Sequence, residues 1–124
     1  MKRLIFILCL FPFFTNAQLV DTSGINWLET EHDFGNIPFN KPVTHIYKFV
    51  NNSKEVAEIV SVEASCGCTE PVWTKTPIMP KDTAVVEATY KANTEGTFKK
   101  QVTIYTNRSS FPTNLILKGV VIRP

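Results

Sequence analysis

Two cysteines separated by one glycine form the most reactive grouping in this sequence. Cys66, Gly67 and Cys68 lie in the stretch VEASCGCTEPVW at residues 62–73, and the chain has one other cysteine, Cys9. Two thiols at this spacing can form a disulfide, bind a soft metal ion, or exchange disulfides with another molecule. Which chemistry applies depends first on whether Cys9 is present in the mature protein.

A disulfide between Cys66 and Cys68 is sterically feasible but adds little stability. We expect Gly67 to adopt backbone angles closed to other residues and so bring the two Cα atoms within the roughly 4.4–6.8 Å that a disulfide requires. A closed loop of three residues stabilises the fold by at most about 1.6 kcal/mol through chain entropy. Strained, exposed disulfides are also reduced more easily, which admits a redox function.

The metal and redox alternatives each need groups beyond the two thiols. A thiol–disulfide enzyme activates its thiolate with a nearby cation or a Cys-x-x-Cys loop, and here the nearest downstream cation is Lys75. A closed zinc site needs four ligands, which only His32 and His45 could complete, whereas copper(I) can begin at a two-sulfur clip. We favour a local disulfide or thiol pair that shapes the loop beside Pro71 and Trp73.

The remaining conspicuous side chains have ordinary structural explanations beside their functional ones. Trp73 is the binding candidate, because aromatic anchors dominate interfaces. In a small β-sandwich, however, Trp73 and Trp27 more often fill the core or cover its open end. His45 is in phase with apolar neighbours and is interpreted as a core or half-buried residue, and His32 as an exposed one.

The first residues are typical of a secretory signal peptide. Lys2 and Arg3 precede an apolar run at residues 4–14, and small residues lead to a predicted cleavage after Ala17. The run is far shorter than the roughly 20 residues that cross a bilayer as a helix. We therefore predict that residues 1–17 are removed, that the mature chain begins at Gln18 without a membrane span, and that it is periplasmic or secreted.

Cys9 is expected to leave with the signal peptide. Bacterial lipoproteins carry a small residue directly before the acylated cysteine, whereas Leu8 precedes Cys9. Export also places Cys66 and Cys68 in a compartment where disulfides persist. We therefore predict that these two cysteines are oxidised to each other.

Charge and motifs exclude several classes of function. Removing residues 1–17 takes Lys2 and Arg3 from the 13 basic residues and leaves 11 against 11 acidic ones. A neutral chain whose one adjacent basic pair is Lys99-Lys100 does not predict a nucleic-acid binder. The sequence contains no nucleophile elbow, zinc-protease motif, phosphate loop or dinucleotide fingerprint. We expect no enzymatic activity and no cofactor.

The segments around the cysteines have the two-residue alternation that is typical of β-strands. Short runs of alternating or β-branched residues are separated by turn-forming residues at intervals of about ten, which is typical of an immunoglobulin-like sandwich of about seven strands. The Pro-rich stretch at 71–80 cannot be a central strand and should lie on an edge or cross between sheets. The expected strands are Asn26–Asp33, Val43–Asn51, Val56–Glu63, Thr83–Tyr90, Thr97–Thr106 and Asn114–Ile122, with a further extended piece at Val72–Ile78.

Alternation along these strands predicts the core. Residues two apart on a strand share one face, so apolar residues at that spacing should point inward together. A turn is expected at Gly35-Asn36-Ile37-Pro38, before the second expected strand. The predicted core consists of Val43, His45, Tyr47, Phe49, Val86, Ala88, Tyr90, Phe98, Val102, Ile104, Leu115, Leu117 and Val121.

Four ordered blocks resemble the bacterial family of domains of unknown function numbered 1573. They are HDFGNIPFNKPVTHIYKFVNNS at 32–53, SCGCTEPVWTKTPIMP at 65–80, EGTFKKQVTIYTN at 95–107 and LILKGVV at 115–121. The resemblance implies an exported, all-β, immunoglobulin-like domain without an established activity. Many members have Pro-Gly where this chain has Pro80-Lys81, so the geometry of that turn is open.

The sequence thus predicts one immunoglobulin-like domain at residues 18–124, acting without catalysis as an interaction module of the bacterial envelope or periplasm. The expected partner is a protein or envelope component, bound at a sheet edge or end loop. The alternative is a periplasmic copper-binding or thiol-redox accessory protein that uses Cys66 and Cys68.

Overall fold

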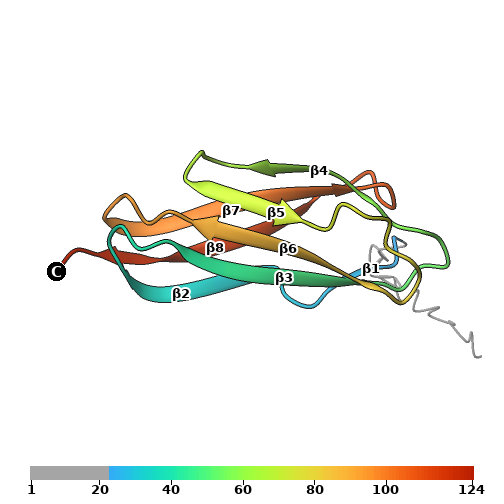
Figure 1. The fold of residues 1–124 in the computed structure, drawn as a ribbon, viewed down its shortest axis with the longest axis horizontal. Helices are drawn as coiled ribbons and strands as arrows, with labels where there is room; N and C mark the ends of the chain where they lie inside the picture. Colours follow the sequence, from blue (N-terminus) through green and yellow to red (C-terminus); the bar gives the residue numbers. More distant parts are fainter. Residues whose placement is uncertain (1–22) are drawn as a thin grey trace, which may run out of the picture.

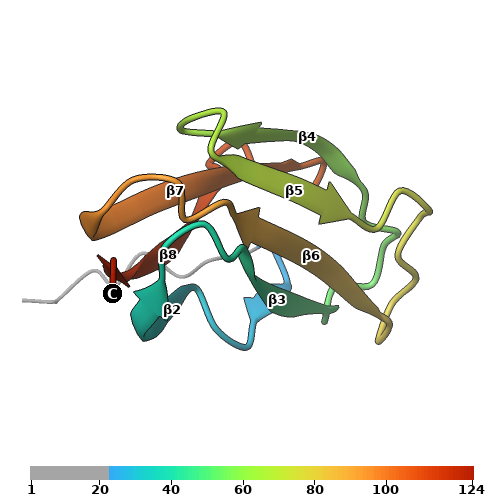
Figure 2. The same ribbon diagram turned by 60° about the vertical axis from the view of Figure 1, so that its left-hand side comes forward.

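The computed structural model describes residues 23–124, and the predicted signal peptide at 1–17 lies outside that range. Two four-stranded sheets pack face to face, which confirms the all-β sandwich (Figures 1 and 2). No segment between Ser23 and Pro124 forms a helix able to cross a membrane. The strands are β1 (Ile25–Trp27), β2 (Glu31–Pro38), β3 (Val43–Asn51), β4 (Ile59–Ala64), β5 (Thr69–Trp73), β6 (Thr83–Tyr90), β7 (Gly96–Thr106) and β8 (Thr113–Ile122).

The strand order leaves four edges, two on each side of the sandwich. One sheet runs β1-β3-β6-β5 and the other β2-β8-β7-β4. The neighbouring pairs are antiparallel except β2 and β8, which are parallel. As a result, β1 and β2 are edges on one side, and β4 and β5 are edges on the other side, around the Cys-Gly-Cys loop.

The expected strand at Asn26–Asp33 was wrong, because this segment forms two strands in different sheets. β1 pairs with β3, and after Leu28–Thr30 the chain enters the second sheet as β2, beside β8. The split raises the strand number from about seven to eight. Nothing in the alternation of side chains marks the crossing, since each half remains extended.

The turn expected at Gly35 was also wrong. Gly35 lies inside β2, where the pairing with β8 shifts register between Asp33 and Asn36. Gly35 has φ 68°, and its amide donates a 2.8 Å hydrogen bond to the Asp33 carboxylate. Glycine tolerates this left-handed angle, so the turn chemistry read from the sequence produces a β-bulge instead of a strand end.

The Pro-rich segment contains an edge strand, as predicted, but the strand has different bounds. β5 covers Thr69–Trp73, earlier than the expected Val72–Ile78, and it is an edge strand, as Pro71 requires. Past β5, Ile78 pairs with Ala57 in an isolated bridge. β4, in contrast, begins at Ile59, later than the expected Val56.

The predicted inward faces form the core. Ten of the thirteen core candidates belong to the main cluster of buried side chains, Phe49 lies in a second cluster, and Val43 and His45 are half-buried at the start of β3. Tyr90 and Phe98 stack at 4.1 Å across the two sheets. The main cluster contains Ile37, Tyr47, Val86, Ala88, Tyr90, Ala92, Phe98, Val102, Ile104, Leu115, Leu117 and Val121.

The turn between the Pro-rich segment and β6 explains the departure from the family pattern. The Asp82 amide bonds the Met79 carbonyl at 3.0 Å, which closes a turn with Pro80 at its second position. Lys81, at the third position, has φ 74°, the angle for which type II turns favour glycine. The chain therefore keeps the turn that Pro-Gly would form, with a lysine in a left-handed conformation.

Candidate functional site

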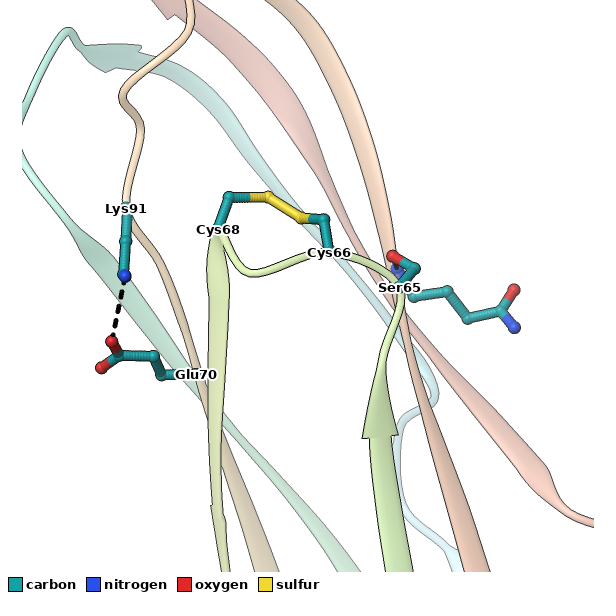
Figure 3. Close-up of a disulfide and its surroundings, with 6 residues drawn as sticks. Ser65, Cys66, Cys68, Glu70 and Lys91 are labelled. Carbon is teal, nitrogen blue, oxygen red and sulfur yellow. Dashed lines mark hydrogen bonds and ion pairs between the residues drawn. A yellow bond between two sulfur atoms is a disulfide. The ribbon is translucent and has the colours of Figure 1, made fainter.

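The Cys-Gly-Cys loop connects the two sheets at one end of the sandwich. It follows β4 and precedes β5, and Figure 3 shows the two sulfur atoms bonded above the loop. The Cα atoms of Cys66 and Cys68 are 5.3 Å apart, within the usual disulfide range. Oxidation of this pair in the exported protein stays a prediction.

Gly67 does not adopt the glycine-specific backbone angles that we expected from the sequence. It does not have a positive φ, and a Cβ placed on it would meet nothing within 4 Å. The expectation that only glycine permits this geometry was therefore wrong. The short spacing of the two cysteines, and not the conformational freedom of Gly67, brings the sulfurs together.

Backbone hydrogen bonds hold the loop from both sheets. The Lys91 amide donates to the Cys68 carbonyl at 2.9 Å, just after β6. On the other side, the Ser65 amide donates to the Gln101 carbonyl at 2.9 Å, and the Gln101 amide donates to Ser65 Oγ at 3.1 Å. The loop is thus fixed to β7 and to the end of β6 independently of the disulfide.

The cations near this loop are already engaged. Lys91 forms an ion pair with Glu70 (Figure 3), with Nζ 3.2 Å from Oε1, and Lys75 Nζ lies 4.8 Å above the Trp73 ring. A low-pKa thiolate would need such a cation beside the sulfur. These contacts give the thiol-redox alternative no support.

Trp73 covers the open side of the sandwich. It pairs with buried Val86 of β6, so its side chain shares the inward face, and it packs half-buried against the main core cluster. Its placement matches the core-covering role weighed for it in the sequence. The neighbouring residue Val72 points outward instead and is 61% exposed.

The open edges of β4 and β5 differ in what they offer to another strand. Cys68 and Thr74, which flank β5, form backbone hydrogen bonds with residues near the two ends of β6. Because alternate residues of an antiparallel strand bond the same neighbour, the amides and carbonyls of residues 69, 71 and 73 face the open side. Pro71 has no amide hydrogen, and the Thr69 amide is directed to the Cys66 carbonyl. β5 therefore has little capacity to accept a new strand.

β4 has the more complete edge. The Ser65–Gln101 bond sets an alternation in which residues 61 and 63 bond β7, so the amides of Val62 and Ala64 face outward. No proline occurs in β4, and Val60, beside its register shift, is 60% exposed. Figures 1 and 2 both show β4 and β5 side by side, although they belong to different sheets.

A second polar grouping lies on the opposite side of the sandwich and was not predicted from the sequence. Glu29, in the β1–β2 connection, hydrogen-bonds His32 Nδ1 through Oε1 at 3.3 Å and His45 Nε2 through Oε2 at 3.1 Å. The two imidazole rings stack at 3.6 Å with planes 8° apart. His32 belongs to β2 and His45 to β3, so the grouping spans both sheets.

The charge on Glu29 fits this arrangement. Burial opposes its ionisation, but the hydrogen bonds and charges of His45 and then His32 outweigh that effect and lower the pKa of the Glu29 carboxyl. An ionised carboxylate only accepts hydrogen bonds, so both histidines present N–H groups to it. The alternation of residues in β3 correctly predicted that His45 points inward. The division of the first expected strand, which brings His32 beside His45, could not be seen in the sequence.

Comparison with known proteins identifies a family but no activity. A family model described as "Protein of unknown function (DUF1573)" matches residues 25–121. A search of curated proteins found no match.

Solved structures with similar folds share little sequence with this chain. A protein of unknown function from Porphyromonas gingivalis W83 is 14% identical with a TM-score of 0.68, and the match covers 77% of this chain but 46% of that one, less than half its length. A PapD-like domain of human CEP192 is 8% identical with a TM-score of 0.66, covering 91% and 99%. The VesB protease of Vibrio cholerae is 10% identical with a TM-score of 0.64, covering 81% and 32%. At these identities the likeness establishes the fold alone.

Proposed function

The chain belongs to the DUF1573 family of proteins of unknown function, and we propose that it is an exported, non-catalytic interaction module that binds a partner strand at the open edge of β4. The outward amides of Val62 and Ala64 carry this proposal. Main-chain hydrogen bonds to such an edge supply affinity, and pockets for alternate side chains supply specificity. The proposed partner is a protein of the bacterial envelope or periplasm.

The filled interior supports an edge surface over a deep pocket. Aromatic and aliphatic side chains occupy the space between the sheets, including Tyr47, Tyr90 and Phe98. One surface hollow, beside the ends of β2 and β8, is lined mainly by exposed residues such as Pro38 and Ile122.

The side chains of the edge suit a contact surface. Val60 on β4 and Val72 on β5 are 60% and 61% exposed on either side of the disulfide loop. Exposed β-branched residues on an edge strand favour pairing with another strand unless a charge or proline intervenes. Pro71 provides that protection on β5, whereas β4 has no proline and one exposed charge, Glu63, whose side chain does not remove the outward amides of Val62 and Ala64.

A proline at Ala64 tests the proposal. Ala64→Pro removes an outward amide while leaving the bonds between β4 and β7, and Ala64→Ser is the matched control that keeps the amide. Partner capture from envelope extracts should be lost with Ala64→Pro and kept with Ala64→Ser, provided circular dichroism shows both to be folded. Equal capture by the two variants would place the interface elsewhere, and Trp73→Ala would then test the loop.

Export is a separate part of the proposal. It is supported by the charged, apolar and small-residue sequence of residues 1–17. Mass spectrometry of the exported protein should find an N-terminus at Gln18. An N-terminus at Met1 or a lipid on Cys9 would contradict it.

A further inference from the structure

Glu29, His32 and His45 bring three potential metal ligands together from separate segments of the chain. One ligand atom from each lies within 4.8 Å of the other two. The side chains of His32, His45 and Glu29 are 32%, 20% and 43% exposed, so an ion can reach them from solvent. Two imidazoles and one carboxylate match the donor sets that hold zinc with one open position.

We propose that Glu29, His32 and His45 bind one divalent transition-metal ion, with zinc as the reference ion. Imidazole nitrogen and carboxylate oxygen suit zinc, nickel and copper(II), in contrast to the thiolates that select copper(I). This site is therefore distinct from Cys66 and Cys68 in both position and chemistry. A water molecule or a group from a partner would complete a tetrahedral coordination shell.

The two spacings between the carboxylate and the imidazoles are close to those of a zinc site. Bonds of about 2.0–2.1 Å at tetrahedral angles place neighbouring ligand atoms about 3.3 Å apart. The carboxylate lies 3.3 Å from His32 Nδ1 and 3.1 Å from His45 Nε2. A bound ion would replace both hydrogen bonds, with each neutral imidazole presenting a lone pair in place of its N–H.

Binding requires one local rearrangement. The rings are stacked nearly parallel, so their in-plane lone pairs lie in two parallel planes and do not meet at one point. Rotation of one or both half-exposed rings can open the stack without moving the strands. Phe34 packs edge-on against His32 at 4.6 Å, and Tyr47 edge-on against His45 at 4.7 Å, so the rotation takes place beside an aromatic wall.

Nearby polar groups are committed to other partners. The Tyr47 hydroxyl donates to the Ile116 carbonyl at 2.6 Å, and Glu31 pairs with Lys118 at 2.9 Å. The ligand set is therefore Glu29 and the two histidines, with one negative charge when the imidazoles are neutral. A bound cation would link β2 to β3, and with them the two sheets, where β2 and β3 make few other contacts.

Zinc titration of the untagged exported chain tests the site. Calorimetry should give one zinc ion per chain, and His32→Phe and His45→Phe should each weaken binding by more than about tenfold, the lower range for losing even an outer partner of a metal ligand. Phenylalanine keeps an aromatic ring in the stack but offers no ligand. Imidazole proton NMR signals of the wild type should shift as the stack opens.

Two further variants make the outcome decisive. Cys66→Ser/Cys68→Ser should bind zinc like the wild type, which separates this site from the thiols. Glu29→Gln changes an exposed side chain, preserves the fold, and should weaken zinc binding even if a histidine variant misfolds. Absence of stoichiometric binding in the wild type, or undiminished binding in Glu29→Gln and both histidine variants, would overturn the proposal.

Discussion

The side-chain amide of Asn51 donates a hydrogen bond to the carbonyl of Ile78, 2.9 Å away and 27 residues later in the chain. The same nitrogen donates to the Glu55 carbonyl at 2.8 Å, and Asn51 Oδ1 accepts from the Ser53 amide and hydroxyl. Asn51 is fully buried, so these bonds satisfy its amide group. One side chain thus fixes the turn after β3 against the segment before β6.

Asn51→Ala should lower the free energy of unfolding by about 2–4 kcal/mol. The change removes four hydrogen bonds, each contributing roughly 0.5–1.5 kcal/mol, and takes from the Ser53 amide its acceptor, whereas the Ile78 and Glu55 carbonyls each keep a second donor. Urea unfolding measures the difference. Asn52→Ala, at the exposed neighbouring position, is the control and should change stability by no more than about 0.5 kcal/mol.

Reduction of the Cys66–Cys68 disulfide should leave the domain folded. Its three-residue loop limits the entropic stabilisation to about 1–2 kcal/mol, a minority of the roughly 5–15 kcal/mol of a typical domain. The backbone bonds from Lys91 and Ser65 also hold the loop without it. Thermal melts with and without reductant measure the effect, and thiol counting on the denatured protein, purified without reductant after removal of residues 1–17, should find no free thiol. Two free thiols, or unfolding upon reduction, would contradict this account.

Lys81→Gly should stabilise the domain by about 0.5–1 kcal/mol, because glycine adopts the left-handed angle of Lys81 without the penalty that a Cβ imposes. Lys81→Ala separates the loss of the lysine side chain from this backbone effect and should give no such gain. Gly67→Ala is the converse case, where no positive φ requires glycine, and should keep or slightly raise stability. Denaturant midpoints compare all three.

Stability should fall in alkaline solution, in part through Tyr90. Burial raises the pKa of the Tyr90 phenol above its usual value of 10.0. The unfolded chain therefore loses this proton at lower pH than the folded chain does, and the stabilisation is complete below about pH 10 and lost as pH rises toward the folded pKa. Tyr90→Phe should show a weaker decline above about pH 10. An identical pH dependence in both proteins would exclude Tyr90 as a contributor.

Much of the sandwich could be predicted from local pattern. Val86, Ala88 and Tyr90 alternate strictly and are buried as expected, and Pro71 correctly placed its segment on an edge. The division of the first strand could not be predicted, because Leu28–Thr30 contain no turn-forming residue and β2 pairs with β8, which is distant in the sequence. Gly35 was misread since a bulge and a turn use the same left-handed glycine.

The candidate sites were predictable to different degrees. The loop at Cys66 and Cys68 is local, and its residues could be recognised from their spacing alone. The open edge of β4 depends on strand order, and the grouping of His32 with His45 depends on two sheets meeting at Glu29. Both are properties of the assembled sandwich and have no local signature.

The parallel pairing of β2 with β8 has a mechanical consequence. β2 lies in the N-terminal part and β8 in the C-terminal part of the domain, and in Figure 1 β1 and the C-terminus lie toward opposite ends of the long axis. Tension applied between Ser23 and Pro124 would therefore load the β2–β8 hydrogen bonds in shear, all at the same time. Tension between Glu95 and Ile122 would instead unzip β7 from β8 bond by bond. In an optical trap, the first geometry should resist the higher force.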